Sequence, residues 1–263
     1  MDLGLTGRVA LVAAASSGLG LAVARALAAE GADVSISARD PERLARAHEE
    51  VDRAGPGRVL STVVDVTDEA AAAGWVRRTA EELGALHVVV TNSPGVPHGR
   101  ADAFAVDDYR QAFDGSTLPH VALTLAALPY LRQAGWGRVL MITSEAVRQP
   151  LPGTAMSAVA RLGVLGFAKG LVHSLGASGV TVNVLAPGVH QTPAFEGFVA
   201  AHSQRSGVDR ETALKEIAAE VPLGRIGQPA DFGALAAFLA SRHAGFVTGT
   251  VLLVDGGNTR GIG

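Results

Sequence analysis

Short, continuously apolar runs alternate with longer, Ala- and Leu-rich segments of helical pattern from one end of the chain to the other. The apolar runs predict seven strands, at residues 9–13, 34–38, 59–64, 87–91, 138–143, 180–185 and 250–254. The segments between them predict helices, most clearly at residues 20–30, 41–54, 68–83 and 157–174. Most of the runs are apolar throughout rather than at every second residue, which indicates strands buried on both faces of a parallel sheet.

One strand per helix along the whole chain implies crossover connections, and therefore an α/β fold with a doubly wound parallel sheet of the Rossmann type. No linker or repeat interrupts the alternation, so we expect residues 1–263 to form a single domain. Residues 192–222 depart from the pattern, because they are helical and polar and lie between the sixth and seventh predicted strands. We interpret this segment as a small helical lid at the ligand-binding end of the sheet; the alternative is a surface hairpin of two helices.

Composition narrows the class of protein. The 263 residues are 48% hydrophobic, which is typical of a compact globular chain. A net charge of -3 gives no reason to expect nucleic acid or an anionic membrane as a partner. The chain has no cysteine, which excludes disulfides, thiolate nucleophiles and cysteine-based metal sites. No signal-peptide pattern begins the sequence, and polar residues or prolines interrupt the apolar helical segments, so we expect a cytoplasmic protein without a membrane span.

The turn after the first predicted strand, residues 13–20, reads Ala-Ala-Ala-Ser-Ser-Gly-Leu-Gly and leads directly into a helix. A glycine-rich turn at a helix N-terminus presents unpaired N–H groups and the positive end of the helix dipole to a pyrophosphate. Ser16 and Ser17 can cap that helix or donate to a phosphate. The alternative is that Gly18 and Gly20 only allow the helix to pack closely on the strand.

Several motifs, in the same order along nearly the whole chain, resemble those of the short-chain dehydrogenase/reductase family. The family's Thr-Gly-x-x-x-Gly-x-Gly falls on residues 13–20, its Asn-Asn-Ala-Gly on residues 92–95 and its Pro-Gly-x-x-x-Thr on residues 187–192. The stretches at residues 222–225 and 248–257 are also similar to the family. The resemblance implies a nicotinamide dinucleotide held by Ala14, Ser16, Ser17, Gly18, Leu19, Gly20, Arg39, Asp65, Val66, Asn92, Gly95, Pro187, Gly188 and Thr192.

Two of these positions bear on which dinucleotide binds and how well. Arg39, at the end of the second predicted strand, can accommodate a 2′-phosphate, whereas an NAD site places a carboxylate there. We therefore expect NADP(H); the alternative is that Arg39 is a solvated charge. Ala14 stands where the family has its first glycine, and a positive φ there would strain alanine by about 1 kcal/mol. We expect dinucleotide binding to be weakened rather than abolished.

The family's catalytic Asn, Ser, Tyr and Lys are matched in only one place, by Ser144 at the end of the fifth predicted strand. The resemblance implies that Ser157 and Arg161 stand in place of the tyrosine and the lysine, and that Ser116 stands in place of the asparagine. A serine hydroxyl is a far weaker acid than a phenol of pKa about 10, and an arginine stays protonated. Ser144, Ser157 and Arg161 could still polarise a carbonyl or hold an oxyanion; the alternative is that the last two only keep the site polar.

Other residues could supply the acid. His98, after the fourth predicted strand, and His190, after the sixth, lie where family members contact substrate, and histidine transfers protons near neutral pH. Glu145 directly follows Ser144. Each of the three could instead be a residue without a catalytic role. No spacing of His, Asp and Glu suggests a metal site.

Serine and arginine in these two places resemble a divergent, 3-oxoacyl-[acyl-carrier-protein] reductase-like branch of the family. Three functions stay open: an NADP(H)-dependent oxidoreductase of a small carbonyl or hydroxyl substrate, a non-redox lyase, isomerase or cyclase, and a catalytically silent NADP(H)-binding subunit. The resemblance also implies a homodimer or homotetramer, for which the apolar stretches 118–131 and 162–175 could supply the contact.

Overall fold

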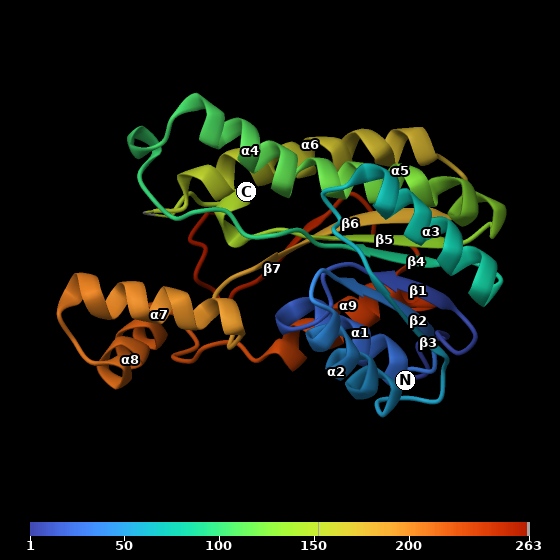
Figure 1. The fold of residues 1–263 in the computed structure, drawn as a ribbon, viewed down its shortest axis with the longest axis horizontal. Coiled ribbons are helices and arrows are strands. Elements are labelled where there is room, and N and C mark those ends of the chain that lie inside the picture. Colours follow the sequence, from blue (N-terminus) through green and yellow to red (C-terminus); the bar gives the residue numbers. More distant parts are fainter. Residues whose placement is uncertain (152, 262–263) are drawn as a thin grey trace.

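A computed structural model describes residues 1–151 and 153–261 of the chain. Within these residues, seven strands form one parallel sheet in the order β3-β2-β1-β4-β5-β6-β7 (Figure 1). The strands are β1 (Val9–Val12), β2 (Asp33–Ala38), β3 (Val59–Val63), β4 (Val88–Thr91), β5 (Gly137–Ile142), β6 (Val180–Pro187) and β7 (Val251–Val254). Each overlaps one predicted strand, and the prediction of a doubly wound parallel sheet is confirmed.

Helices cover both faces of the sheet (Figure 1). One face carries α1 (Gly18–Ala29), α2 (Pro41–Asp52) and α9 (Pro229–Ala240); the other carries α3 (Glu69–Leu83), α4 (Val106–Ser116), α5 (Leu118–Gln133) and α6 (Ala155–Leu175). Each layer has its own apolar core, with Leu27 and Phe232 buried in the first and Trp75, Leu123 and Val164 buried in the second. Burial on both sides explains why the strands are apolar throughout.

Local signals in the sequence set where several helices begin and end. Asp40 precedes Pro41 and accepts hydrogen bonds from the backbone N–H groups of the first turn of α2. Asp68 caps α3 in the same way, and Gly84 ends that helix with a φ of 84°. Three short 3₁₀ turns complete the connections: η1 (Ala101–Ala103), η2 (Glu145–Val147) and η3 (Arg242–Ala244).

The strand order reverses between β1 and β4, and ligands of such sheets bind at the carboxyl ends of the strands beside this point. Beyond those ends lie α7 (Pro193–Ser206) and α8 (Arg210–Glu220), which extend away from the sheet (Figure 1). The pair has a small core of its own, which includes Phe195 and Ile217. An ion pair of 2.8 Å between Arg210 and Glu196 also joins the two helices.

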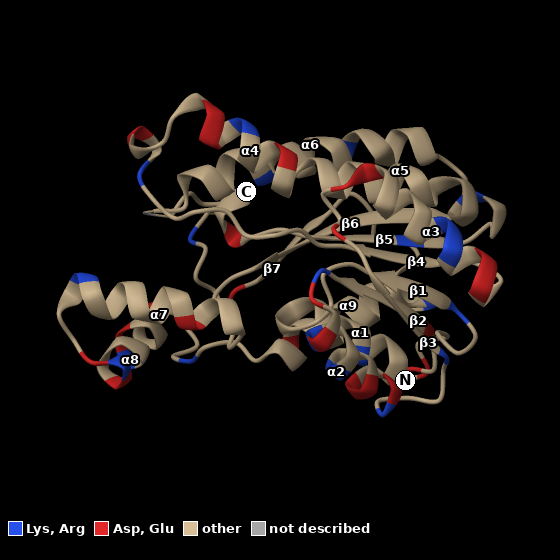
Figure 2. Ribbon diagram, in the orientation of Figure 1, with Lys and Arg blue, Asp and Glu red and all other residues tan. Residues whose placement is uncertain are grey.

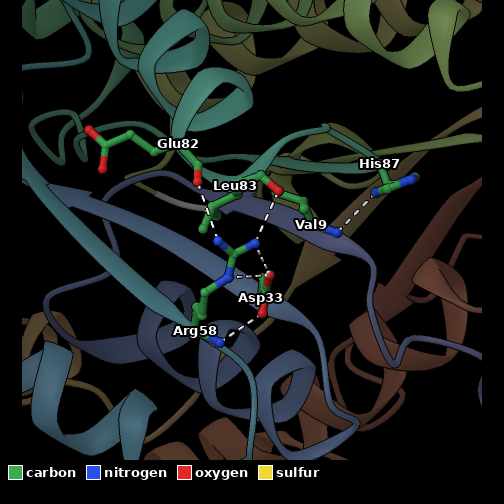
Figure 3. A network of polar contacts seen from close by, with 6 residues as sticks. All are labelled: Val9, Asp33, Arg58, Glu82, Leu83 and His87. Carbon is green, nitrogen blue, oxygen red and sulfur yellow. Dashed lines mark hydrogen bonds and ion pairs between the residues drawn. The ribbon is translucent and has the colours of Figure 1, made fainter.

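At the amino-terminal side of the sheet, Arg58 joins three segments (Figure 3). Its guanidinium donates to the carboxylate of Asp33, at the start of β2, and to the carbonyl oxygens of Glu82 and Leu83, at the end of α3. These bonds hold the connections before β2 and β3, far in the fold from the carboxyl ends of the strands. Arg58 therefore has a structural role.

Positive and negative side chains are interspersed over the outer helices, with no face of one sign in view (Figure 2). By length and composition alone, α6 is apolar enough to cross a membrane, although Lys169 and His173 interrupt it. Its residues Val164, Ala168 and Leu171 are buried in the core between the helices and the sheet.

Candidate functional site

The turn between β1 and α1, which is the predicted phosphate cradle, contains a left-handed backbone position and a tightly packed glycine. Ala14 has a φ of 51° and is the only non-glycine residue with a positive φ among those the structure describes. Gly20 packs so tightly that a Cβ there would lie 2.5 Å from the carbonyl oxygen of Ala14. Ser17 stands at the N-cap of α1 and its hydroxyl makes no capping hydrogen bond, so the hydroxyl is available to a ligand. The positive φ at Ala14 is the conformation for which we expected alanine to be strained.

The far end of the predicted dinucleotide site contains Arg39 and Asp65, which follow β2 and β3. Arg39 Nη1 lies 3.9 Å from Asp65 Oδ2, and both side chains are exposed. Hydrogen bonds from the backbone N–H and hydroxyl of Thr67, together with the charge of Arg39, lower the pKa of Asp65. Val66 is buried beside it. A weak, exposed ion pair leaves Arg39 able to turn toward another anion.

The loop after β4 begins in the middle of the sheet and is hydrogen-bonded to the segment that precedes α6. Asn92 Oδ1 accepts from the backbone N–H of Ser93, and Gly95 has open space where a Cβ would be. Farther along, the N–H of Gly99 donates to the carbonyl oxygen of Gly153 at 2.8 Å. His98 is exposed, and its ring centroid lies 6.3 Å from that of Phe198 on α7. The loop thus contacts both α7 and the segment that precedes α6.

Ser157 and Arg161 lie one turn apart on α6 and are hydrogen-bonded: Arg161 Nη1 donates to Ser157 Oγ at 2.6 Å. Ser157 is buried, and burial lowers the pKa of Arg161. Ser144 ends the β5 segment, where its Oγ accepts from the backbone N–H of Ala146. Ser116 is also buried, and its Oγ donates to the carbonyl oxygen of Pro94, so it holds the loop after β4 in place.

The loop after β6 approaches the phosphate cradle. Thr192 caps α7, and its Cγ2 lies 3.4 Å from where a Cβ on Gly18 would be. Pro187 ends β6, and Gly188 fits against Asp255, whose Cβ would lie 2.7 Å from a Cβ at position 188. The structure therefore brings together residues that were predicted separately at the β1–α1 turn and in the β6–α7 loop.

The ring of His190 is packed rather than open. Its Nδ1 lies 3.0 Å from the carbonyl oxygen of Gly188, and its ring stands edge-on to Phe232 with centroids 5.7 Å apart. A Cβ on Gly227 would lie 2.8 Å from the ring. Burial lowers the pKa of His190, which keeps it neutral at physiological pH. Of the two candidate histidines, His98 is the more accessible.

Two residues in this region were not among the predicted site residues. Glu145, which drew notice only as the neighbour of Ser144, is buried; its Oε2 accepts from Asn258 Nδ2 at 2.9 Å. Burial raises its pKa, and the nearby Asp255 raises it further. His120 on α5 is buried with its Nδ1 2.7 Å from Thr91 Oγ1. Nothing in the local sequence marks His120, because its neighbours come from other elements of the fold.

Comparison with known proteins identifies the family of the chain. A family profile described as Enoyl-(Acyl carrier protein) reductase matches residues 13–259. Oxidoreductase UcpA of Escherichia coli strain K12 is 32% identical over 258 residues, which is 97% of this chain and 95% of that protein. NADPH-dependent reductase BacG of Bacillus subtilis is 27% identical over 256 residues, covering 97% of this chain and 99% of its own length.

The fold matches solved structures over its full length. L-sorbose reductase of Gluconobacter frateurii, crystallised with NADPH and L-sorbose, superposes with a TM-score of 0.93 at 27% identity and covers 100% of both chains. Profile, relatives and structure agree along almost the whole sequence. The chain belongs to the short-chain dehydrogenase/reductase family.

Proposed function

We propose that the protein is an NADPH-dependent oxidoreductase that reduces a small carbonyl compound, or oxidises the corresponding alcohol, without the family's tyrosine and lysine. The observation that carries the proposal is the 2.6 Å hydrogen bond from Arg161 to Ser157. Family membership and the names of the relatives support oxidoreductase chemistry.

The chain's own residues fit NADPH at both ends of the dinucleotide. The N–H groups of the β1–α1 turn and the hydroxyl of Ser17 would hold the pyrophosphate, and Arg39, only weakly paired with Asp65, would bind the 2′-phosphate. Thr192, beside Gly18, would contact the nicotinamide end. When bound, NADPH supplies a hydride, and the protein supplies position and charge stabilisation.

Ser157, Arg161 and Ser144 would bind the reacting oxygen. Because Ser157 Oγ accepts a hydrogen bond from Arg161, its own O–H proton is directed elsewhere and can donate to a substrate carbonyl. The positive charge of Arg161 stabilises negative charge that develops on that oxygen, and Ser144 is a second donor. Preorganised donors of this kind contribute about 100-fold or more to rate each.

The proton that completes the reduction would come from water or from His98. His98 is exposed in the loop beside α7, whereas the ring of His190 is packed against Gly227 and Phe232. Histidine near neutral pH is a suitable acid, and water can reach an exposed one.

The test is to incubate the protein with NADPH and a panel of keto-acyl thioesters, quinones and diketones, and to follow the loss of NADPH absorbance. Turnover that falls in Ser157→Ala and Arg161→Met, with NADPH binding retained, supports the proposal. Loss of turnover in His98→Ala would assign the acid. A gain of activity in Ser157→Tyr/Arg161→Lys would show that the rest of the site is intact.

A second candidate function is a non-redox lyase, isomerase or cyclase. The observation that favours it is that the Ser157–Arg161 pair can stabilise an oxyanion without any hydride transfer. Conversion of a substrate in the absence of NADPH would establish this function. Binding of NADPH without turnover of any substrate would instead indicate a catalytically silent subunit.

The proposal also includes a lid over the site and an association between subunits. The α7–α8 pair would act as a lid, since Phe198 on α7 already contacts His98. A homodimer or homotetramer would bury exposed apolar side chains on α4, α5 and α6. These side chains are Phe113, Leu118, Leu125, Val159 and Leu162. Light scattering would establish the number of subunits.

A further inference from the structure

The proposed function gives no role to a buried histidine on which the charge of Arg161 acts. His120, on α5, has no solvent-exposed surface. Its Nδ1 and the hydroxyl oxygen of Thr91, at the end of β4, are 2.7 Å apart. His120 therefore joins the central strand of the sheet to the helix layer that contains the site.

Packing holds α5 and α6 together at this level. Thr117 Oγ1 donates to the carbonyl oxygen of Ala160 at 2.6 Å. The helices approach closely because Gly163 has no side chain; a Cβ there would lie 3.1 Å from Thr117 Cγ2. His120 lies about one turn after Thr117, and Arg161 directly follows Ala160. His120 and Arg161 therefore both lie within about one helical turn of this contact between the helices.

The charge of Arg161 acts on the imidazole. Burial, aided by the positive charge of Arg161, lowers the pKa of His120 to about 3. His120 is therefore neutral at physiological pH, with one ring nitrogen protonated and the other an acceptor. A guanidinium has only donors, so a nearby one favours the tautomer that offers it an acceptor. Because Nδ1 is paired with Thr91, that acceptor is an unprotonated Nε2.

Each of the two side chains has one buried atom without a hydrogen-bond partner: Nε2 of His120 and Nε of Arg161. The tautomer with Nδ1–H donating to Thr91 makes Nε2 an acceptor, and Nε–H of Arg161 is a donor. The two atoms are complementary. One water that accepts from Nε–H and donates to Nε2 would satisfy both.

We propose that His120 is a positioning residue that fixes Arg161 through this water and so aims the guanidinium at Ser157. The proposal rests on the proposed function, in which the Ser157–Arg161 pair binds the reacting oxygen. The observed hydrogen bonds Thr91–His120 and Arg161–Ser157 would then be joined through the proposed water. Because Nε and the two terminal nitrogens share one plane, holding Nε sets the direction of Nη1.

The first experiment requires no enzymatic activity. Long-range proton–nitrogen NMR of the full-length, nitrogen-15-labelled protein reports which ring nitrogen of His120 is protonated, with His120→Gln used to assign the signals. We expect Nδ1 protonated and Nε2 bare, with a shift of the Nε2 resonance in Arg161→Lys, which keeps the charge and loses Nε–H. A protonated Nε2, or a resonance that ignores Arg161→Lys, would overturn the proposal.

The second experiment uses a matched pair of variants. In His120→Gln the amide oxygen can take the place of the Nε2 acceptor, whereas in His120→Asn the amide nitrogen can keep the bond to Thr91 and the acceptor is lost. We expect kcat within about threefold of the parent in His120→Gln and about tenfold lower in His120→Asn, with KM for NADPH unchanged in both. Equal losses in the two variants would show that His120 only fills space, and would overturn the proposal.

The two experiments separate this proposal from the proposed function. If the parent protein turns over no substrate with NADPH, the proposed function fails, and the NMR result alone decides whether His120 and Arg161 are coupled. Thermal unfolding of both variants, followed by circular dichroism, checks that they are folded before kcat is compared.

Discussion

The β1–α1 turn and the site that we propose on α6 differ in how a departure from the family pattern would affect them. At the turn, Ala13 and Ala14 stand where the family has Thr-Gly, and Ala14 still takes a left-handed backbone conformation, with a φ of 51°. On α6 the helix is regular, and its Ser157 and Arg161 are the residues that we propose in place of the tyrosine and the lysine. Phosphate binding by N–H groups depends on backbone shape, whereas proton transfer depends on the identity of a side chain. The first can survive a substitution at the cost of strain, whereas the second then needs another proton donor, for which we propose water or His98.

The largest effect is expected at the turn, from Gly20→Ala. A Cβ on Gly20 would lie 2.5 Å from the carbonyl oxygen of Ala14 and 3.2 Å from that of Ala13, and backbone atoms cannot move aside cheaply. We expect a loss of about 2–3 kcal/mol in the free energy of unfolding in urea, and loss of NADPH binding in a fluorescence titration. Gly74→Ala, in α3 with open space around it, is the control and should be neutral or stabilising. If Gly20→Ala binds NADPH as tightly as the parent protein does, the β1–α1 turn does not bind the pyrophosphate.

On α6, we expect Arg161→Met to lower turnover by about 100-fold while the dissociation constant for NADPH stays within about twofold. Turnover falls because Ser157 loses the donor that orients its hydroxyl, and NADPH binding persists because the cradle does not involve α6. Steady-state kinetics and a fluorescence titration measure the two quantities. Arg77→Met, which removes an exposed guanidinium from α3, should leave both unchanged. If Arg161→Met lowered turnover and NADPH affinity equally, the turn and the α6 site would not be separate in function.

Arg39→Ala should lower NADPH affinity by about 10- to 100-fold and leave NADH affinity nearly unchanged, since a hydrogen bond to a charged group contributes about 1.5–3 kcal/mol. The ratio of the two dissociation constants is the measurement. Arg43→Ala, also exposed but on α2 beside Asp40, is the control for a general loss of positive charge. A preference for NADH in the parent protein would contradict the role given to Arg39.

Much of the fold could be predicted because its signals are local. Continuous apolar runs mark strands that are buried on both faces, and the glycine-rich turn marks the start of α1. Ser157 and Arg161 are four residues apart on a predicted helix, so their contact follows from helix geometry. That these two residues stand in place of the tyrosine and the lysine stays a prediction, because it rests on the resemblance alone.

Contacts between distant segments could not be predicted. Glu145 and Asn258 are 113 residues apart, and His120 and Thr91 are 29 apart. Which side chains meet there depends on how the strand ends and helices pack in three dimensions. The nearness of Thr192 to Gly18 has the same origin, because β1 and β6 are separated by two other strands in the sheet.

Replacing Ala14 by glycine, which would relieve the strain at the turn, is expected to have a smaller effect than the three substitutions above. Ala14→Gly removes the penalty of a positive φ, about 1–2 kcal/mol, and adds about 0.5–1 kcal/mol of backbone entropy to the unfolded state. We expect a net gain of about 0.5–1 kcal/mol in urea unfolding and a modest gain in NADPH affinity. Ala13→Gly, at a neighbouring position without positive φ, should only destabilise. If Ala14→Gly also destabilises, alanine is not strained at this position.

The smallest effect concerns Glu145, close to Ser144 at the end of β5. Burial, with help from Asp255, raises its pKa in the folded protein. The folded state then holds this proton more tightly than the unfolded state, so stability falls as pH rises through the interval between the unfolded and folded pKa values.

The variant Glu145→Gln keeps an acceptor for Asn258 and removes the titration of this side chain. We expect this variant to exceed the parent in stability at about pH 8 and to lose that advantage as the pH falls to about 4, where the parent carboxyl is mostly protonated in both states. Urea unfolding at both pH values measures the difference, and Glu81→Gln, at an exposed position on α3, is the control for the loss of one carboxylate. A stability difference that does not vary with pH would mean that Glu145 titrates as it does in the unfolded chain, and that the end of β5 is better hydrated than its burial suggests.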